Sequence, residues 1–266
     1  MKLSFIIVNY RSKKYLEKCI VSLFEKITGL DFEIIVVNND KDKLGVLSVR
    51  ESFLYKITVV EINKNVGFAK ANNVGVSKSG GDYICFINPD TEVISENVEA
   101  LINEFNFDKN IGVIGPKILK EKIVQPWSVG ADMDIWEILK GKLGFPKSKD
   151  FWCSNEKTEV GWVSGASLFI KKELFLAVGG FDEKFFLYYE DVDLCKRIKT
   201  MDKKIIYYPF FLVKHLEGKS SKKRYRQKIE YFKSQDYYYK KWFNQKIYWV
   251  MKFFRFFYLL RYKIIR

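Results

Sequence analysis

Three apolar runs of the sequence end in polar side chains that could bind a ligand. These side chains are Asn9 and Tyr10 after the run 3–8, Asn38, Asn39 and Asp40 after the run 32–37, and Asn88 and Asp90 after the run 83–87. The run 83–87 does not alternate with polar residues, which is typical of a strand buried on both faces of a parallel sheet, and Pro89 must end it. Ligands of such sheets bind at the carboxyl ends of the strands, so the sequence predicts one shared cleft. Taken alone, Asn-Pro-Asp is equally consistent with a simple turn.

A fourth segment, 189–200 (YEDVDLCKRIKT), could direct one carboxylate towards the interior at the start of a helix. Asp191 lies at helical spacing from the apolar residues that follow it and so heads the apolar face. Glu190, Asp193 and Arg197 fall on another face, where they can pair. Stabilisation by the helix dipole is a sufficient role for the first two. Burial raises the pKa of a carboxyl group and would suit Asp191 to act as a general base.

The segment 63–75 (NKNVGFAKANNVG) combines asparagines with glycines. Gly67 would allow the backbone to approach a ligand closely, and the amides could read a base or a ribose by hydrogen bonds. A loop with a helix cap is the simpler interpretation. The segment is no phosphate-binding loop of a known type, because it contains neither Gly-Lys-Ser/Thr nor Gly-x-Gly-x-x-Gly.

His215 is the only histidine of the chain. A lone histidine is more often structural than a ligand. At the edge of an acidic cleft, however, an imidazole would be a reasonable metal ligand beside Asp90.

The elements that must position these residues alternate between strands and helices. We expect strands at 3–8, 32–37, 57–62, 83–87, 111–114, 163–170 and 205–208, and helices at 13–27, 69–77, 96–105, 171–178 and 189–200. Such alternation predicts an α/β fold with a parallel sheet and right-handed crossovers. Ser95 would cap the third helix, Gly179 and Gly180 would end the fourth, and 124–161 would be irregular.

Length and composition agree with one α/β domain. The chain has 266 residues, of which 48% are hydrophobic and 29% charged, which excludes a disordered protein. The four cysteines lie far apart and indicate reduced thiols of a cytoplasmic protein, with core packing as the expected role of Cys85 and Cys195. We expect no signal peptide, because the first apolar run is too short.

The positive charge is concentrated in the last segment. Residues 222–266 carry 14 Lys/Arg against 2 Asp/Glu, a net charge of +12 out of +14 for the chain. Basic residues interrupt every apolar run, so no run reaches the ~20 residues of a membrane-spanning helix. The pattern predicts a helix on an anionic membrane surface. A helix packed on the body or on a partner is the second interpretation, and a platform for nucleic acid is the third.

Together these stretches resemble the family 2 glycosyltransferases, which are inverting enzymes that use nucleotide sugars, and within them the rhamnosyltransferase-type members that build cell-surface polysaccharides. The matching stretches are FIIVNY at 5–10, VVNN at 36–39, NVGFAKANNVG at 65–75, FINPD at 86–90, SGASLFIKKELFLAVGGFDEKFFLYYEDVDLCKRI at 164–198 and HLEGKS at 215–220. The resemblance implies the GT-A fold over 1–221, with one mixed, mostly parallel sheet, followed by a basic, aromatic, amphipathic helical tail over 222–266.

The resemblance also implies residue roles. Asp191 would be the catalytic base, and Asp90 with His215 would hold Mg²⁺ or Mn²⁺ against the diphosphate. Asn88 replaces the first acid of the family's Asp-x-Asp motif. The donor side would comprise Asn9, Tyr10, Asn38, Asn39, Asn65, Gly67, Asn72, Asn88 and Lys219, with Lys70 as the alternative cation to Lys219. The acceptor side would comprise Trp162, Gly165, Gly180, Asp182 and Glu190.

The implied reaction is a single inverting displacement from a nucleotide-diphosphate sugar to a lipid-linked or oligosaccharide acceptor. The first donor to consider is dTDP-rhamnose, and UDP-sugars are the alternative. The protein would be cytoplasmic and peripheral on the inner face of the cell membrane, without nucleic acid as a partner. A nucleotidyltransferase is disfavoured, because NYRSKKY after the first run contains no glycine. A non-enzymatic basic binding protein is disfavoured by the nearly neutral body.

Overall fold

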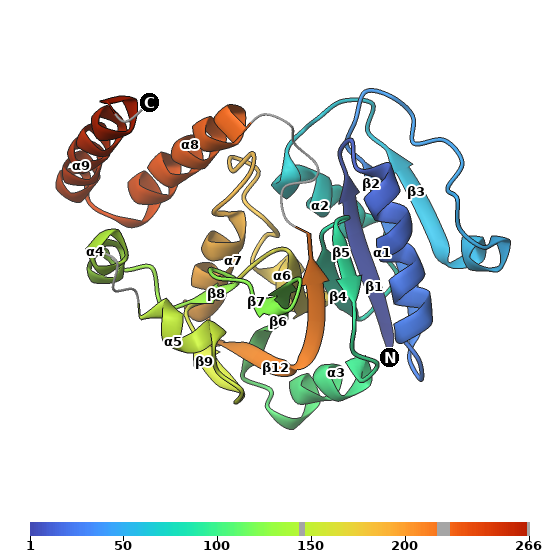
Figure 1. Ribbon diagram of the computed structural model, residues 1–266. Helices are drawn as coiled ribbons and strands as arrows, with labels where there is room; N and C mark the ends of the chain where they lie inside the picture. Colours follow the sequence, from blue (N-terminus) through green and yellow to red (C-terminus); the bar gives the residue numbers. More distant parts are fainter. Residues whose placement is uncertain (144–146, 217–223, 265–266) are drawn as a thin grey trace.

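The apolar runs of the sequence form the centre of a mixed sheet (Figure 1). The computed structural model describes residues 1–143, 147–216 and 224–264. Its strands are β1 (Lys2–Asn9), β2 (Asp31–Asn38), β3 (Ile57–Glu61), β4 (Tyr83–Ile87), β5 (Thr91–Val93), β6 (Ile111–Lys120), β7 (Ile123–Val124), β8 (Val129–Gly130), β9 (Thr158–Val160), β10 (Trp162–Val163), β11 (Ser167–Lys171) and β12 (Lys204–His215). Its helices are α1 (Lys13–Lys26), η1 (Glu51–Lys56), α2 (Phe68–Ser77), α3 (Val98–Phe107), α4 (Ile135–Leu143), α5 (Ser148–Trp152), α6 (Lys172–Ala177), α7 (Glu190–Lys199), α8 (Arg224–Trp242) and α9 (Gln245–Ile264).

The main sheet is mostly parallel, as expected. Its strand order is β3-β2-β1-β4-β11-β6-β12-β5, with β7 beside β6 and β9 beside β12. Parallel pairing joins β1 to β2 and β4, β2 to β3, and β6 to β12, whereas β11 and β5 run antiparallel to their neighbours. The carboxyl ends of β1, β2 and β4 therefore meet at one edge, where the sequence predicts the cleft.

Two apolar layers cover the two faces of the sheet. Phe5 and Ile7 of β1 pack with the buried faces of α1 and α3, while Ile6 and Val8 pack with α2, α6 and α7. This alternation is the period of a strand buried on both sides. β4 is buried along its whole length, which confirms the strand expected at 83–87.

Two expected strands have different bounds in the structure. The strand expected at 163–170 is interrupted, because residues 164–166 form a turn between β10 and β11 in which the Ser167 N–H donates to the Ser164 carbonyl. The strand expected at 205–208 is longer: β12 continues past a register shift between Tyr208 and Leu212, and β5 pairs with its far end. His215 is consequently the last residue of β12 and pairs with Thr91 of β5.

Two local expectations were also wrong. Ser95 does not cap α3, because its Oγ accepts the N–H of Leu212 and so joins β12 instead; α3 begins at Val98, after Asn97. The region 124–161 is not wholly irregular, since it contains the short elements β8, α4, α5 and β9. Gly179 and Gly180 do end α6, with φ of +81° and +71°.

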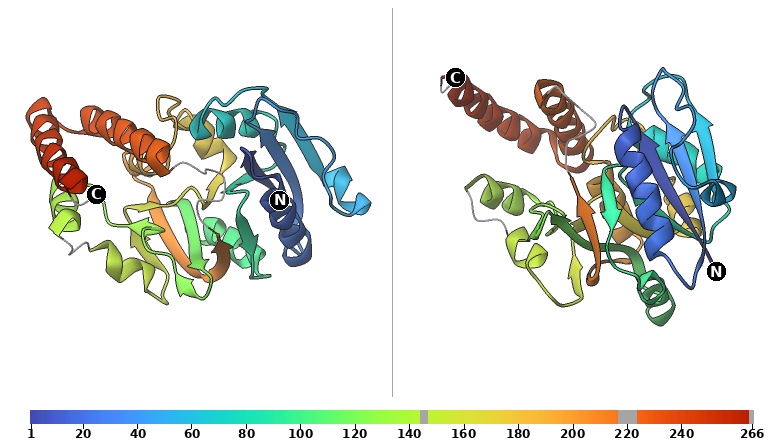
Figure 2. Two further views of the ribbon diagram at one scale, coloured as in Figure 1. Left: turned by 45° about the horizontal axis from the view of Figure 1, so that its top comes forward. Right: turned by 45° about the vertical axis from the view of Figure 1, so that its right-hand side comes forward.

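The tail forms two helices instead of one. Asn244 separates them, and its Oδ1 accepts the N–H of Ile247 at 2.9 Å. Figures 1 and 2 show α8 and α9 beside α7 and α4, on the opposite side of the molecule from α1 and β3. Across the described residues, none of the helices combines the length and the apolar character that crossing a bilayer requires.

Candidate active site

Buried amides connect the carboxyl ends of β1, β2 and β3. Asn9 donates through Nδ2 to Asn38 Oδ1 at 2.8 Å, and Asn38 donates through its own Nδ2 to Glu61 Oε2 at 2.6 Å. Asn9 Oδ1 accepts from Ser12 at the start of α1. The structure thus brings these two predicted donor-side asparagines together at the edge of the sheet, where they also fix the loops around them.

The loop after β3 is fixed by Asn39 and Asn65. Asn39 accepts the N–H of Val66 at 2.8 Å and donates to Asn65 Oδ1 at 3.1 Å, and the same Oδ1 accepts the N–H of Gly67. Gly67 has φ +90°, and a Cβ there would lie 2.7 Å from the carbonyl oxygen of Phe186. The close backbone approach that the sequence predicted at Gly67 is therefore an approach to the chain itself.

Of the two adjacent asparagines on α2, the sequence singled out the less accessible one. Asn72 is 1% exposed, and its Nδ2 donates to the Phe68 carbonyl within the helix. Asn73, which the sequence did not single out, donates to the carbonyl of Phe181 and accepts the N–H of the same residue, both at 2.9 Å. Gly180, with φ +71°, makes room for this contact. These contacts fix the predicted acceptor-side turn to α2.

Asp90 and His215, the predicted metal ligands, are adjacent. His215 Nε2 lies 3.2 Å from Asp90 Oδ1, and both side chains are less than one-tenth exposed. Thr91 opposes His215 in the β5–β12 pair, which sets this contact. Asn88 Nδ2, from the predicted donor side, lies 3.4 Å from the same Nε2.

The hydrogen bonds of His215 suit it to bind a cation. Gln125 Oε1 lies 2.9 Å from Nδ1, so the tautomer with its proton on Nδ1 would donate to Gln125 and present the Nε2 lone pair to the carboxylate of Asp90. Two acceptors this close need a shared proton or a cation between them. The described residues contain no group of three or more His, Cys, Asp and Glu that could hold a metal. A magnesium-type ion that takes its remaining ligands from substrate phosphates and water fits such a two-donor site.

Asp191 lies in the first turn of α7 and faces the turn at 164–166. Its Oδ2 accepts the N–H of Gly165 at 2.8 Å, and its Oδ1 accepts the N–H of Val192 at 2.8 Å. Part of the residue remains exposed. Burial raises the pKa of Asp191, while these two N–H groups oppose the rise. The Asn88 N–H donates to the Ala166 carbonyl at 3.0 Å, so one short turn links Asp191 to the strand end that bears Asp90.

Glu190 differs from its neighbour in being almost fully buried. It is 4% exposed, and its Oε2 has no hydrogen-bond partner among the residues that the structure describes. Burial, and then the charge of Asp191, raise the pKa of Glu190 well above its usual range. A carboxyl group in such surroundings is stabilised as the neutral acid.

Other predicted residues are engaged within the protein or buried in it. Asp182 is bound by Tyr237 and Lys241 of α8. Trp162 is 8% exposed, and its Nε1 has no hydrogen-bond partner among the described residues. Lys70 forms an ion pair with Glu183 at 2.9 Å. Lys219 lies outside the described residues.

Of two acidic residues near the strand ends, sequence reasoning missed Glu61 and named Asp40 without giving it a role. Glu61 ends β3 and accepts from Asn38 and from the N–H of Leu44. Asp40 lies 3.8 Å from Arg11 Nε and is 9% exposed. The signal that could have identified Glu61 is its position at the end of an apolar run, as for Asn9 and Asn38.

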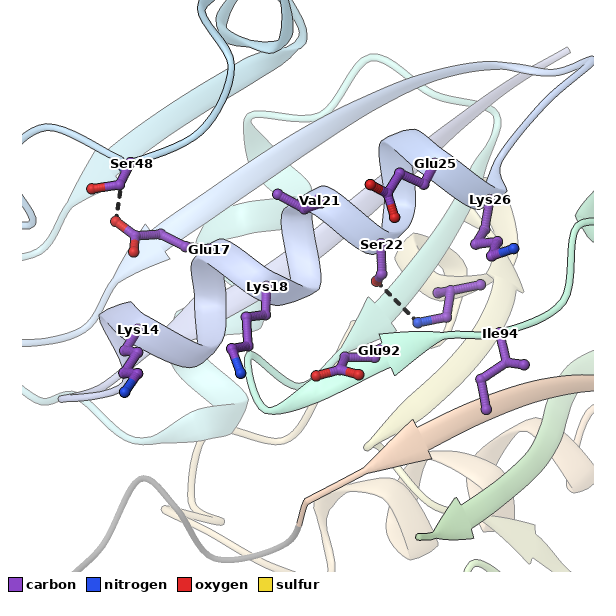
Figure 3. Close-up of a pocket in the computed structure, with 11 residues that line it drawn as sticks. Lys14, Glu17, Lys18, Val21, Ser22, Glu25, Lys26, Ser48, Glu92 and Ile94 are labelled. Carbon is purple, nitrogen blue, oxygen red and sulfur yellow. Dashed lines mark hydrogen bonds between the residues drawn. The ribbon is translucent and has the colours of Figure 1, made fainter. Parts of the chain in front are cut away.

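Two surface hollows lie away from these strand ends. One, of about 500 Å³, lies between α1 and β5 and is lined mainly by charged side chains such as Lys14, Glu17 and Glu92 (Figure 3). The other, of about 330 Å³, is lined by α7 residues, Trp162 and the segment 132–134. The first contains none of the predicted site residues, and the second contains only Trp162.

Comparison with known proteins gives one family. The family model "Glycosyl transferase family 2" matches residues 4–165. The chain is 26% identical over 202 residues to the low-salt glycan biosynthesis hexosyltransferase Agl10 of Haloferax volcanii, covering 74% of this chain and 61% of that protein. It is 24% identical over 239 residues to the N-acetylglucosaminyl-diphospho-decaprenol L-rhamnosyltransferase of Mycobacterium tuberculosis, covering 82% and 77%.

Solved structures have the same fold. GalNAc-T7, solved with UDP, GalNAc and Mn²⁺, superposes with a TM-score of 0.62 at 17% identity, covering 80% of this chain and 43% of that one. The mannosyltransferase PcManGT of Pyrobaculum calidifontis, solved with GDP-Man and Mn²⁺, gives 0.56 at 16% identity, covering 86% and 60%. At these identities the likeness supports the fold alone.

Proposed function

The chain belongs to the family 2 glycosyltransferases, and on this premise we propose that it transfers a sugar from a nucleoside diphosphate to a hydroxyl group of a saccharide acceptor. The observation that supports this most is the environment of Asp191. This carboxylate is part-exposed, has a raised pKa, and is linked by one turn to the strand end of Asp90. A general base and a diphosphate-binding edge on neighbouring elements are what such a transfer needs.

In the proposed reaction, Asp191 takes the proton of the acceptor hydroxyl as its oxygen attacks the anomeric carbon. The bond from that carbon to the diphosphate breaks, and the configuration inverts. Asp90 and His215 would hold a divalent cation, which when bound supplies positive charge for the leaving diphosphate. No covalent sugar–enzyme intermediate is required. Burial raises the pKa of the Cys19 and Cys195 thiols to about 12, which disfavours both as nucleophiles.

We propose rhamnose as the first donor sugar to test, because the Mycobacterium tuberculosis relative is named as an L-rhamnosyltransferase. dTDP-rhamnose is the corresponding donor, and UDP-sugars are the alternative. The name of the same relative includes a diphospho-decaprenol acceptor. For this chain we propose an acceptor of that chemical class, a saccharide carried on a lipid diphosphate.

We propose that α9 binds the anionic inner face of the cell membrane, where such an acceptor would be presented. Tyr248 and Met251 of α9 are buried, whereas Trp249 and Val250 are 57% and 49% exposed. Lys246 and Lys252 are exposed on the same helix. An exposed stripe of aromatic and apolar side chains with flanking lysines suits the interface of an anionic bilayer.

The test is release of nucleoside diphosphate by the full chain. The protein is given dTDP-rhamnose, UDP-sugars and GDP-sugars in turn, with Mn²⁺ or Mg²⁺ and a bacterial lipid extract. The proposal expects release from one donor that depends on both lipid and metal and is lost in Asp191→Asn and Asp90→Ala. A folded protein that binds none of the nucleoside diphosphates would contradict the proposal.

A further inference from the structure

The turn that leads into the proposed base is strained. Tyr188 and Tyr189 have φ of +71° and +68°, a region that side chains other than glycine rarely adopt. Tyr189 is the N-cap of α7, and its carbonyl accepts the N–H of Asp193 at 2.9 Å. The backbone of this tyrosine therefore sets where α7 begins and where Asp191 points. Strain of this kind persists only where neighbouring groups hold the conformation.

The neighbouring groups belong largely to α8. Ser234 Oγ donates to the Leu187 carbonyl at 2.8 Å, and Gln235 Nε2 donates to the Tyr189 hydroxyl at 2.8 Å. The Tyr231 and Tyr189 hydroxyls lie 3.2 Å apart. Ser234 is 4% exposed, so its hydrogen bond is protected from water. α8 thus contacts the strained turn at Leu187 and at Tyr189, on both sides of Tyr188.

A buried ionic cluster attaches the other end of α8. Asp193, one turn into α7, is 0% exposed and binds Lys241 Nζ at 2.8 Å, Trp242 Nε1 at 2.8 Å and Arg197 Nε at 2.8 Å. Lys241 also binds Asp182 at 2.7 Å. One lysine of α8 therefore joins α7 to the turn before it, and a buried carboxylate that loses such a partner is strongly destabilised.

The opposite side of the same turn is fixed by α2. The Phe68 N–H donates to the Phe186 carbonyl at 2.7 Å, beside Gly67. The segment 185–189 is consequently held between a helix of the sheet domain and a helix of the basic tail. If α8 served only to attach the membrane-binding helix α9 to the body, it would not need its contacts to Leu187 and Tyr189.

We propose that α8 is required for catalysis because it positions Asp191. Ser234, Gln235 and Lys241 are positioning residues that hold the 185–189 turn so that Asp191 faces the acceptor hydroxyl. This proposal rests on the proposed function. It also extends the catalytic unit beyond residue 221, where the sequence suggested a boundary. Asn38 bonds to Asp42 and Glu61, and His215 pairs with Asp90, so the contacts that order the donor side differ from those between α8 and the 185–189 turn. Donor binding should therefore be independent of Ser234, Gln235 and Lys241.

The test compares matched pairs of variants of the full chain. Ser234→Ala is paired with Ser77→Ala, because the Ser77 hydroxyl is exposed and donates to the Val74 carbonyl of its own helix. Lys241→Met is paired with Lys233→Met, whose side chain is 66% exposed and pairs with Glu230. Lys241→Arg keeps the charge and should restore part of the loss. The measurements are the kcat of nucleoside diphosphate release, the Kd for the nucleoside diphosphate with Mn²⁺, and hydrogen exchange of the 185–191 backbone.

We expect Ser234→Ala and Lys241→Met to lower kcat about 10-fold and to accelerate exchange at 185–191, with Kd unchanged, while both controls match the wild type. Faster exchange with unchanged kcat would overturn the proposal, as would unchanged exchange. An equal loss of donor binding would also overturn it, by indicating general unfolding. If the wild type releases no nucleoside diphosphate, the proposed function fails separately, and the exchange data still decide whether α8 holds the turn.

Discussion

Glu190 and Asp191 are neighbouring carboxyl groups with different surroundings, and the difference has a consequence for stability. Burial raises the pKa of Glu190 in the folded protein above its unfolded value. The folded state then binds more protons than the unfolded state, so stability is full below the unfolded pKa and falls as the pH rises towards the folded pKa. Part of the folding free energy is therefore lost at neutral pH.

We predict that Glu190→Gln raises the Tm at neutral pH and leaves it nearly unchanged at pH values below the usual glutamate pKa. Each kcal/mol that is relieved should raise the Tm by roughly 2–4 °C for a protein of this size. Thermal unfolding across this pH range is the measurement. Glu183→Gln is the control and should lower the Tm at neutral pH, because Lys70 lowers the pKa of Glu183. A Tm that falls in Glu190→Gln at neutral pH would show that the ionised form is stabilised instead.

The Asp90–His215 pair gives a second prediction at this scale. Asp90→Asn and His215→Ala should each raise the Mn²⁺ concentration for half-maximal nucleoside diphosphate release by at least about 10-fold, since the pair supplies both protein donors of the proposed site. Titration of Mn²⁺ at saturating donor is the measurement, with the exposed Glu51→Gln as control. An unchanged Mn²⁺ requirement in both variants would exclude this pair as the metal site.

Gly67 lies where the start of α2 contacts the 185–189 turn, and a substitution there tests this contact between the two segments. Its φ of +90° and ψ of 167° form a combination essentially restricted to glycine, and a Cβ would collide with Phe186. We predict that Gly67→Ala lowers the free energy of unfolding by about 1–3 kcal/mol, measured by denaturant titration. Gly80→Ala, where the nearest atoms lie 3.5 Å away, should stay within about 0.5 kcal/mol. Equal stabilities of the two variants would contradict the contact between α2 and the 185–189 turn.

The sequence predicted the strands that are apolar and buried along their length. It missed the strands that form only because two distant segments pair with each other. The runs at 3–8, 32–37 and 83–87 are buried on both faces, so their composition alone identifies them. β5 and the far half of β12 exist because Thr91–Val93 and Val213–His215 pair with each other, and no local pattern indicates that pairing. The turn at 164–166 was missed for the same reason, since its Gly165 faces Asp191 of a distant helix.

The candidate site likewise has residues that the sequence could predict and contacts that it could not. The types and the locations of Asn9, Asn38 and Asp90 could be predicted, because strand ends converge in a parallel sheet. Their partners could not. Asp193 was assigned to a face where it pairs with Arg197, which is confirmed, but its complete burial depends on α8. Only tertiary structure reveals that a helix more than 40 residues later covers that face.

At the scale of the whole molecule, the basic tail has one helix on the body and one with an exposed apolar stripe. We predict that the protein binds vesicles of phosphatidylglycerol and phosphatidylcholine, that it binds phosphatidylcholine vesicles weakly, and that added salt weakens the binding. Trp249→Ser should reduce binding several-fold in a co-sedimentation assay. Phe107→Ser, at a side chain that is 83% exposed on α3, should not. Equal binding to both kinds of vesicle would contradict an electrostatic membrane surface at α9.

The measurement that tests the central claim most directly is single-turnover sugar transfer by Asp191→Asn, with donor binding measured on the same sample. A general base contributes about 10²–10⁴-fold. We therefore predict a transfer rate lower by at least about 10²-fold, while the Kd for the nucleoside diphosphate with Mn²⁺ stays at the wild-type value. Transfer at the wild-type rate in Asp191→Asn would contradict the role of Asp191 as the base that activates the acceptor hydroxyl.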